Sequence, residues 1–498
     1  MIAGLLELGN DEAYYQSYAL YLQWNYFDHP PMVAWLIRFS TANLSLHHEI
    51  FVRSGAVICA AFGTWLIFVI GKKIRNEHTG WILAILYSTS FYTSIIAGIF
   101  VLPDSPQVVF WLASIYYMLC ILDKRESGGQ RNRYFIFLGF SIGLCILSKV
   151  HGGFLWLGFG AYVVLYRRQL LKNPYLWLSV SVTLLIVSPI YIWNVSNHFI
   201  TYTYHQERLN FFGHSPDLWN LFQQVFGSVF YSNPVNFILY AGAAIALAGK
   251  NREQFPEVFP LFLWLSLPLI GILVWTSLFS ETLPHWSGPA YLSWMILAAC
   301  WLDGMGMQKA MSWLKISCWV FVLVVMISIL AIWYLPLNVG SRQPDHLGKG
   351  DIMLDLSGWK KFSSEFDSLY RSDFSSGKMK KNALILSNYW FPAGHLDHYY
   401  AVPFHRTLLA YGPLNNIHHF AWLNDKRQRP EKDQDAYFIY PTNYYGPPEE
   451  TLKQKFDLVE DSVVIPQYRS GIIVRDFIIY RMHGYHGDSL DFLIPGIK

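Results

Sequence analysis

Residues 315–335 read KISCWVFVLVVMISILAIWYL, an apolar run whose single charge, Lys315, stands at its start. Wound as a helix, such a run is long enough to cross a hydrocarbon core roughly 30 Å thick. In the whole chain 53% of the residues are hydrophobic and 14% are charged, whereas a soluble domain carries about 25% charged residues. The run and the composition together predict a membrane protein.

Apolar blocks of about 16–22 residues recur along the chain as far as residue 335, and each matches the thickness of a bilayer. We expect ten membrane spans, at roughly 52–71, 79–99, 105–122, 133–149, 152–166, 174–194, 229–248, 258–279, 286–304 and 315–335. A large soluble core would also be apolar, but it would not repeat this block length. The sequence therefore predicts a mainly α-helical, polytopic transmembrane helix bundle over residues 1–337.

Residues 338–498 have a different character, because their charge density rises and short runs typical of β-strands appear. These runs are Ala383–Leu386, Ala436–Tyr440 and Ile472–Tyr480. The tail is predicted to be a small soluble α/β domain outside the membrane.

The N-terminal region is amphipathic over residues 11–50, where aromatic and polar side chains mix. Two short helices lying in the interface plane, broken at Pro30-Pro31, would fit this pattern. Residues 1–10 are too short to span a membrane, and they lack the basic start and cleavage site of a signal peptide. We expect them to be the end of a further helix.

Positive charge alternates from loop to loop, and loops rich in Lys and Arg are predicted to be cytoplasmic. They carry Lys72, Lys73, Arg75, Lys124, Arg125, Arg131, Arg133, Arg167, Arg168, Lys172, Lys250, Arg252, Lys309 and Lys315. The opposite loops before the tail hold Arg38, Arg53, Lys149 and Arg208. Asp11, Asp104, the 195–228 loop and the tail should therefore face the periplasmic side of a bacterial inner membrane.

The five cysteines are predicted to be small buried hydrophobes, because each falls inside an apolar block and no two form a CxxC pair. They are Cys59, Cys120, Cys145, Cys300 and Cys318. We expect neither a disulfide framework nor a metal site from them.

Ionisable groups gather in two neighbouring segments just outside the bilayer: Asp11-Glu12, and Asp28-His29 within the sequence YFDHPP. Transfer of a sugar to a hydroxyl needs a base for the acceptor proton, which a carboxylate can supply. It also needs positive charge or a metal beside the departing phosphate. Asp11 is the candidate base, with His29 near the phosphate. The alternative is a solvated loop whose acids cap interfacial helices.

Asp104 lies in the sequence LPDSP, in a very tight outward turn between two spans. An aspartate in this position can act as a helix N-cap, because its carboxylate satisfies free backbone N–H groups. It can also serve as a second carboxylate that meets Asp11 on the same face, holds a metal or orients the acceptor.

Lys149 lies in SKVHGG, where two apolar spans meet at the outer boundary of the membrane. A lysine at membrane depth is energetically costly and is usually functional, although it can also extend to the interface. We favour a phosphate contact, since the headgroup of a lipid phosphate lies at that depth.

Two further outward segments, Ile192-Trp193-Asn194 and Pro284-His285-Trp286, combine aromatic rings with polar groups. Sugar recognition uses this combination, and so does any aromatic belt at a membrane interface. For His285 a structural role is the favoured interpretation and a substrate contact is the alternative.

The motifs follow one another in a recognisable order. They are DE at Asp11-Glu12, YFDHPP at Tyr26–Pro31, PDSP around Asp104, SKVHG around Lys149, IWN at Trp193 and HW at His285. The set resembles the GT-C-fold family of polyprenyl-phosphate-dependent glycosyltransferases, which includes the protein O-mannosyltransferases of family 39 and the lipid A aminoarabinose transferase. Each motif is weak alone, but the ordered set covers most of the membrane region on the side that the topology demands.

The resemblance implies that Asp11 is the catalytic acid/base residue, with Glu12 beside it, and that Asp104 is the second acid of the site. It also implies that the YFDHPP segment approaches the lipid phosphate. In the aminoarabinose branch this segment reads EKPP, so that a lysine stands where His29 stands here. Lys149 or a protonated His29 would have to take over its phosphate contact.

The resemblance also extends to substrate contacts and to a metal. We predict that the lipid phosphate or the sugar is contacted by Tyr15, His29, Lys149, His151 and His285. The aminoarabinose branch places a metal near the acid of the YFDHPP-like segment, which makes Asp28 the single candidate ligand for a divalent cation.

We therefore predict an enzyme that transfers a hexosyl or pentosyl group with inversion, in the membrane, from undecaprenyl phosphate to a hydroxyl. The acceptor would be a glycolipid such as lipid A, a surface polysaccharide or a protein, and no nucleic acid is involved. A transporter or lipid flippase is the main alternative, and a catalytically dead assembly partner is the third. Transporters place their working charges near the bilayer midplane, whereas these acids gather at one face.

Overall fold

The computed structural model describes residues 2–126, 128–208, 215–249, 252–444 and 446–487. The chain forms two compact units. The first, here called the sheet unit, comprises Met1–Gln23, Ile37–Val52 and Met326–Lys498. The second, here called the helical unit, comprises Trp24–Leu36 and Arg53–Val325. The expected fold class, a mainly α-helical membrane protein with a C-terminal domain built on a sheet, is confirmed.

The helical unit consists of helices. They are α2 (Met32–Ser40), α3 (Glu49–Ile74), α4 (Glu77–Thr89), α5 (Asp104–Leu122), α6 (Gly128–Ser148), α7 (Phe154–Tyr166), α8 (Pro174–Ser196), α9 (Ile200–Arg208), α10 (Leu218–Tyr231), α11 (Pro234–Ala248), α12 (Phe259–Ser277), α13 (Gly288–Gly304) and α14 (Met307–Tyr334). Of these, α2, α3 and α14 extend into the sheet unit at one end. Within the described residues, α3, α5, α8, α12 and α14 are long and apolar enough to cross a membrane. The bent pair α10–α11 adds a sixth crossing if it counts as one span.

A break in the helix lies within the span predicted at roughly 229–248. The chain forms α10 and α11 there, and their axes differ by 99°. Asn233 breaks the helix with a φ of 70°, and its side chain accepts a hydrogen bond from the backbone N–H of Val235. Pro234 follows directly and has no N–H with which to continue the earlier helix. The predicted span 79–99 is also interrupted, because α4 ends at Thr89 and a separate π-helical turn follows it at Tyr92–Ile96.

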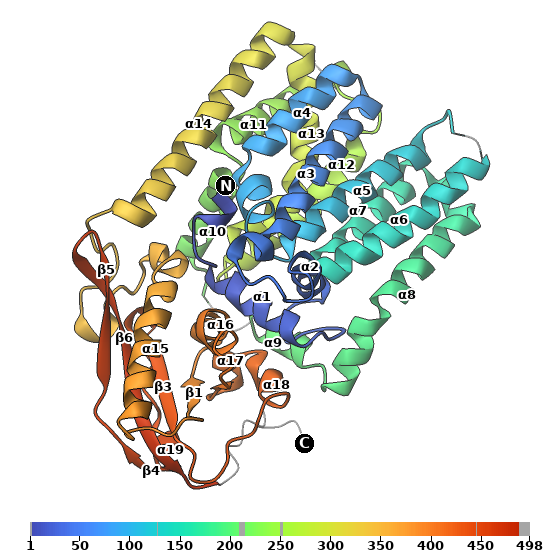
Figure 1. Ribbon diagram of the computed structural model, residues 1–498. Helices are drawn as coiled ribbons and strands as arrows, with labels where there is room; N and C mark the ends of the chain where they lie inside the picture. The colour runs from blue at the N-terminus through green and yellow to red at the C-terminus, as the bar shows by residue number, and fades with distance from the viewer. Residues whose placement is uncertain (1, 127, 209–214, 250–251, 445, 488–498) are drawn as a thin grey trace. The chain divides into compact units, whose positions relative to one another are not determined.

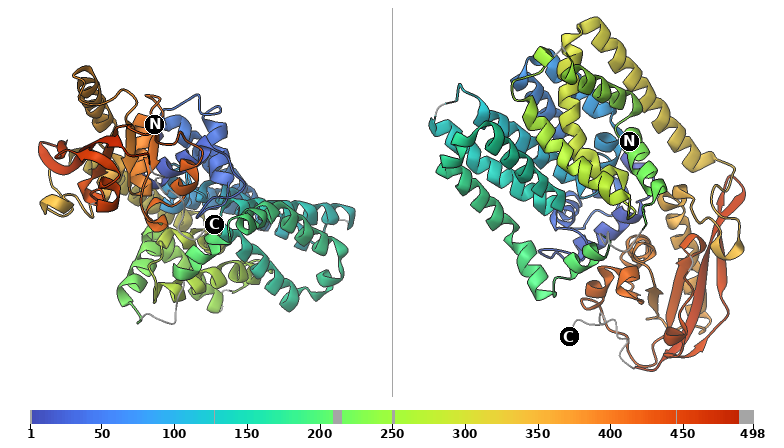
Figure 2. Two further views of the ribbon diagram at one scale, coloured as in Figure 1. Left: turned by 90° about the horizontal axis from the view of Figure 1, so that it is seen from below. Right: turned by 180° about the vertical axis from the view of Figure 1, so that it is seen from behind.

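Helix α6 packs between α5 and α8, and the three form a row that Figures 1 and 2 show from opposite sides. Small residues allow the close approach of α6 and α8. A Cβ atom on Gly139 would lie 2.2 Å from the carbonyl oxygen of Ser179, and the hydroxyl of Thr183 donates to the carbonyl of Gly139 over 2.8 Å. Small residues spaced by four are typical of such helix contacts in membranes, and Gly143 continues the series toward Ile186.

The sheet unit contains the helices α1 (Asn10–Leu20), α15 (Trp359–Ser375), α16 (Trp390–Leu396), α17 (Leu414–Ile417), α18 (Phe420–Asn424) and α19 (Glu450–Lys453). Its strands are β1 (Leu384–Ser387), β2 (Leu408–Ala410), β3 (Ala436–Pro441), β4 (Phe456–Val459), β5 (Val463–Arg469) and β6 (Ile472–Tyr485). The predicted β-runs correspond to β1, β3 and β6, while β2, β4 and β5 were not predicted.

The sheet is mixed, with the order β2-β1-β3-β6-β4 and with β5 paired to β6. Strand β1 runs parallel to β2 and β3, whereas β6 runs antiparallel to β3, β4 and β5. Helix α15 lies along this sheet (Figure 1), and the ring of Phe362 stacks 4.1 Å from that of Phe477 on β6. Behind this apolar contact, Asp373 of α15 accepts hydrogen bonds from Arg481, at 2.6 and 3.0 Å. The helix is therefore fixed by ring packing and by a buried ion pair.

The N-terminal segment belongs to the sheet unit. Glu7 accepts hydrogen bonds from the backbone N–H groups of Trp359 and Lys360, so that its carboxylate caps the start of α15. Helix α1 packs against α16, where the rings of Tyr14 and Trp390 lie 4.8 Å apart. The two short helices predicted within residues 11–50 are present as α1 and α2, with the prolines between them.

Candidate active site

The centre of the candidate site is a buried ion pair in the helical unit. Asp104 is the first residue of α5, and Lys149 follows the last residue of α6. The Nζ atom of Lys149 lies 2.8 Å from Oδ2 of Asp104, and the two side chains are 5% and 2% exposed. Pro103 occupies the N-cap position of α5, so the carboxylate of Asp104 is used for the lysine and not as the N-cap.

A tyrosine that the sequence did not single out completes the bonding of Asp104. The hydroxyl of Tyr92 donates to Oδ1 of Asp104 over 3.0 Å. Tyr92 opens the π-helical turn after α4, and a Cβ atom on Gly288 would lie 2.4 Å from its ring. The absence of a side chain at the start of α13 therefore leaves room for the phenol that holds the carboxylate. Tyrosines are common in membrane proteins, and nothing in the sequence around Tyr92 marks it.

Three histidines surround the ion pair. His151 and His285 each interact electrostatically with Asp104, with Lys149 and with His29. The ring of His151 lies 6.0 Å from that of Trp286, and its buried Nδ1 has no hydrogen-bond partner among the described residues. The structure thus brings together five of the predicted site residues within the helical unit.

The position of the cluster follows from the direction of the helices. Asp104 begins α5, Lys149 and His151 precede α7, and His285 precedes α13. The N-terminal end of a helix carries unsatisfied N–H groups and a partial positive charge. Three such ends therefore accompany the lysine and the imidazoles, which makes the site suitable for an anionic group such as a phosphate.

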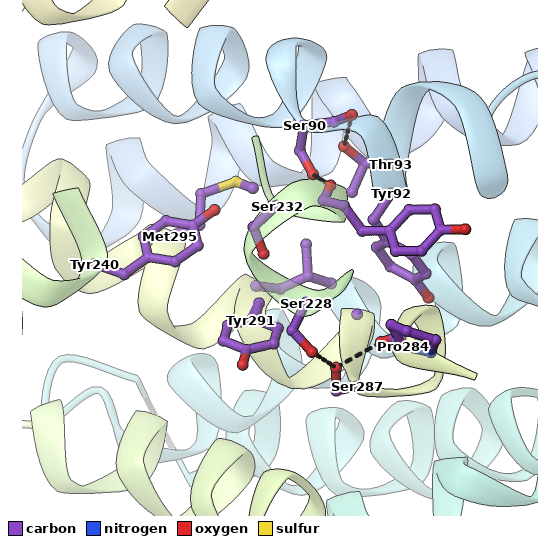
Figure 3. Close-up of a pocket in the computed structure, with 13 residues that line it drawn as sticks. Ser90, Tyr92, Thr93, Ser228, Ser232, Tyr240, Pro284, Ser287, Tyr291 and Met295 are labelled. Atoms are coloured by element: carbon purple, nitrogen blue, oxygen red, sulfur yellow. Dashed lines mark hydrogen bonds between the residues drawn. The ribbon is translucent and has the colours of Figure 1, made fainter. Parts of the chain in front are cut away.

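A small pocket lies beside Tyr92, and most of the residues that line it are serine, threonine or tyrosine (Figure 3). Ser228 and Ser287 form part of its lining and are hydrogen-bonded to each other, with their oxygens 3.1 Å apart. Its accessible volume is about 10 Å³, which accommodates about one water molecule. Among the described residues that line it none is charged, so the pocket is a neutral extension of the site.

Asp11, Glu12 and Tyr15 lie on α1 in the sheet unit. The carboxylate of Glu12 accepts a hydrogen bond from the backbone N–H of Gly9 over 2.8 Å, and the side chain is buried. Glu12 therefore supports the first turn of α1. Tyr15 is buried as well, with its ring 5.5 Å from that of Tyr18. Asp11 is half-buried in the same first turn, and its convergence with Asp104 stays a prediction.

The predicted metal ligand, Asp28, is half-buried beside His29. Across the residues that the structure describes, no three His, Cys, Asp or Glu side chains form a group that could hold a metal ion. Asp28 as a ligand therefore stays a prediction.

Arg53 is a second residue of the helical unit whose role the sequence did not reveal. It lies near the start of α3, is fully buried, and has its guanidinium 5.5 Å from the ring of Phe100. A buried arginine in an apolar helix is usually functional. Phe100 is close in sequence to Asp104. Arg53 is therefore a further cation in the part of the bundle that contains Asp104.

Comparison with known proteins finds similarity to glycosyltransferases. Residues 28–193 match the family model of dolichyl-phosphate-mannose-protein mannosyltransferases. The lipid A galacturonosyltransferase RgtD of Rhizobium johnstonii is 23% identical over 304 residues, which cover 59% of this chain and 60% of that protein. The match thus spans three fifths of the length of this curated relative.

The solved structures of ArnT from Cupriavidus metallidurans have the same fold. Both the apo form and the form bound to undecaprenyl phosphate give a TM-score of 0.60 at 15% sequence identity. The comparison covers 96% of this chain and 94% and 95% of theirs. The predicted resemblance to GT-C glycosyltransferases is confirmed.

Proposed function

From the premise that this chain has the fold of the GT-C glycosyltransferases, we propose that it transfers a sugar from a polyprenyl phosphate to a hydroxyl group. The acceptor in this proposal is a glycolipid, as for the lipid A galacturonosyltransferase that it resembles. The reaction takes place at the outer face of a bacterial inner membrane, the side to which the charge pattern of the loops assigns the site.

The buried Lys149–Asp104 pair carries the proposal. A departing polyprenyl phosphate gains negative charge as its bond to the sugar breaks, and fixed positive groups stabilise that charge. Lys149 supplies one such group, and His29, His151 and His285 supply donors around it. Asp104 holds Lys149 in place, and Tyr92 holds Asp104 in turn. Little reorganisation is therefore needed when the phosphate binds.

The proposed reaction is a single displacement. The acceptor hydroxyl attacks the anomeric carbon on the side opposite the phosphate, and the new C–O bond forms as the bond to the phosphate oxygen breaks. The hydroxyl proton passes to the carboxylate of Asp11, and the polyprenyl phosphate leaves with the electron pair. A hexosyl or pentosyl group is transferred with inversion at the anomeric carbon.

The transport alternative has one feature in its favour, the bent pair α10–α11, because transporters bind their cargo at broken helices. At this break, however, the side-chain amide of Asn233 donates to the carbonyls of Thr89 and Ser317, at 2.9 and 3.1 Å. The break is thus closed by neutral groups of neighbouring helices. The ionisable residues gather at the ends of helices, which favours surface chemistry.

A deletion strain provides the first test. Mass spectrometry of its lipids should reveal an accumulated polyprenyl-phosphate sugar and a missing glycolipid product. The accumulated lipid then serves as the donor for the purified chain in proteoliposomes. Formation of a glycosylated product together with free polyprenyl phosphate supports transfer, whereas movement of the intact lipid between leaflets without a product supports the flippase.

Asp11→Asn provides the second test in the same assay. We expect transfer to fall by at least about a hundredfold, since a general base contributes on that order, while the variant inserts and melts as the parent does. Asp345→Asn is the matched control, because Asp345 is an exposed carboxylate of the same unit. Unchanged turnover in Asp11→Asn would eliminate the proposed base.

A further inference from the structure

The sheet unit contains a pocket that the proposed reaction does not use. It has a volume of about 330 Å³, within the range of about 300–1,000 Å³ of small-molecule sites. Its walls come from the end of α1 at Tyr21, from the segment before β2 at Arg406, and from the segment after α18 at Lys426 and Arg427. All of these segments belong to the sheet unit.

One wall of the pocket is a neutral ion pair. Nη2 of Arg427 lies 2.5 Å from Oδ2 of Asp397, with both side chains buried, and its Nη1 donates to the carbonyl of Leu408 over 2.7 Å. The hydroxyl of Ser17 on α1 donates to the same carboxylate oxygen over 3.3 Å. Asp397 is therefore already satisfied, and Arg427 is held in a fixed position.

The remaining charge of the pocket is positive. Asp397 is the single carboxylate among the described residues that line it, whereas Arg406, Lys426 and Arg427 are all cationic. The guanidinium of Arg406 lies 4.2 Å from the ring of Tyr370, and its Nη1 donates to the carbonyl of Lys381 over 3.1 Å. Arg406 is thus fixed by packing, while the side chain of Lys426 is exposed. Beyond its own ion pair, the pocket is lined by two further cationic residues, Arg406 and Lys426.

The rest of the lining is apolar or aromatic. Leu20, Tyr21, Val402 and Leu408 contribute side chains between the cations. Arginine and lysine recognise carboxylate and phosphate groups through charge-assisted hydrogen bonds. Apolar and aromatic groups beside them would pack against the C–H face of a sugar ring. We propose that this pocket binds an anionic saccharide, a sugar unit that carries a phosphate or a carboxylate.

The pocket stands in a fixed relation to Asp11, because both belong to α1. Asp11 is in the first turn of the helix and Leu20 is its last residue. At a rise of 1.5 Å per residue, the two ends lie roughly 14 Å apart. On the proposed function, which this step requires, the charged sugar would be part of the acceptor. It would anchor a glycolipid in the pocket. The reactive hydroxyl of that glycolipid, separated from the charged sugar by the length of a short oligosaccharide, would then reach Asp11.

Binding by the full-length chain in nanodiscs, without any donor lipid, tests the pocket independently of transfer. The probes are glucuronic acid, glucose 1-phosphate, glucose and inorganic phosphate, measured by isothermal titration calorimetry or by saturation-transfer NMR. We expect at least one anionic sugar to bind about tenfold or more tightly than glucose, since hydrogen bonds to a charged group are stronger than those between neutral groups. Equal binding of glucose, or of inorganic phosphate alone, would overturn the assignment to an anionic saccharide.

Lys426→Gln should weaken binding of the anionic sugar by roughly five- to tenfold and should leave the melting temperature unchanged, since this exposed side chain lacks an ion pair among the described residues. Lys349→Gln removes the same charge from an exposed position of the sheet unit outside the pocket and should have no effect. Asp11→Asn should bind the sugar as the parent does. Unaltered binding in Lys426→Gln would contradict the proposed site, whereas a chain that binds normally but transfers nothing would contradict the proposed reaction alone.

Discussion

Nζ of Lys149 and Oδ2 of Asp104 lie 2.8 Å apart at a junction of three helices, with both side chains almost completely buried. A buried pair of this kind is stabilising only while it is complete, because removal of one partner leaves the other charge without compensation. The pair is therefore both a structural element of the bundle and the centre of the proposed phosphate site. Variants can separate these two roles.

Lys149→Gln should lower the free energy of unfolding by about 3–5 kcal/mol and should abolish transfer. The double variant Asp104→Asn/Lys149→Gln should recover most of the stability, since no unpaired charge remains, but none of the activity. Thermal unfolding in detergent and the transfer assay measure the two effects. Additive losses of stability in the double variant would show that the two residues are not energetically coupled.

Tyr92→Phe should destabilise the helical unit by about 1.5–3 kcal/mol, because it removes a hydrogen bond to a buried carboxylate. Tyr240→Phe is its matched control in the same pocket, since the buried hydroxyl of Tyr240 has no hydrogen-bond partner among the described residues. We expect that control to be neutral or slightly stabilising. Equal melting temperatures of the two variants would argue against the Tyr92–Asp104 bond.

Gly288→Ala should displace the ring of Tyr92, since the added Cβ would lie 2.4 Å from it. Overpacking of this kind costs about 1–3 kcal/mol, and transfer should fall together with stability. Gly271→Ala on α12 is the control, because a Cβ there meets no atom within 4 Å. A fully active, stable Gly288→Ala chain would contradict the packing described for Tyr92.

The pH dependence of the stability of the sheet unit should reveal the raised pKa of the Asp355 carboxyl. Burial raises the pKa of its carboxyl from 3.8 to about 6, although Arg475, Asn10 and Tyr444 act in the opposite direction. The folded chain thus holds a proton that the unfolded chain releases near pH 3.8. The resulting stabilisation is complete below about pH 4 and is lost as the pH rises through about 6.

Asp355→Asn should therefore flatten the fall in stability between about pH 4 and pH 6. Hydrogen exchange of the amides of β3 (Ala436–Pro441), corrected for the intrinsic pH dependence of exchange, measures this slope in the sheet unit. Asp345→Asn alters an exposed carboxyl and should leave the slope as it is. An identical slope in the parent and in Asp355→Asn would rule out a raised pKa.

Hydropathy and charge predicted the positions of most helices, because the length and composition of a span are local properties of the sequence. They failed at Asn233, where a positive φ before a proline divides an apolar block whose hydropathy is uninterrupted. The strands β2 and β4 were missed because three or four residues carry too little periodicity to stand out. Strand β5 was missed although it has seven residues, because Pro466, Gln467 and Arg469 interrupt its apolar run.

The cluster around Asp104 was predictable where a motif marks a helix end. Asp104 and Lys149 were chosen because they lie where apolar spans meet, and the helical unit brings them together with His29, His151 and His285. Tyr92 could not be chosen in this way, since its role depends on a π-helical turn and on the space beside Gly288. Contacts of this kind are set by tertiary packing, which no single segment encodes.

The hydrogen bond between Glu7 and the backbone of Trp359 joins residues 352 positions apart in the chain. During synthesis at about 5–20 residues per second, the N-terminal segment must wait roughly 20–70 s for this partner to emerge. Through that interval α1 exists without α16, the helix against which Tyr14 packs. The helix that carries Asp11 can therefore complete its packing only after the tail, 352 positions further along the chain, has been made.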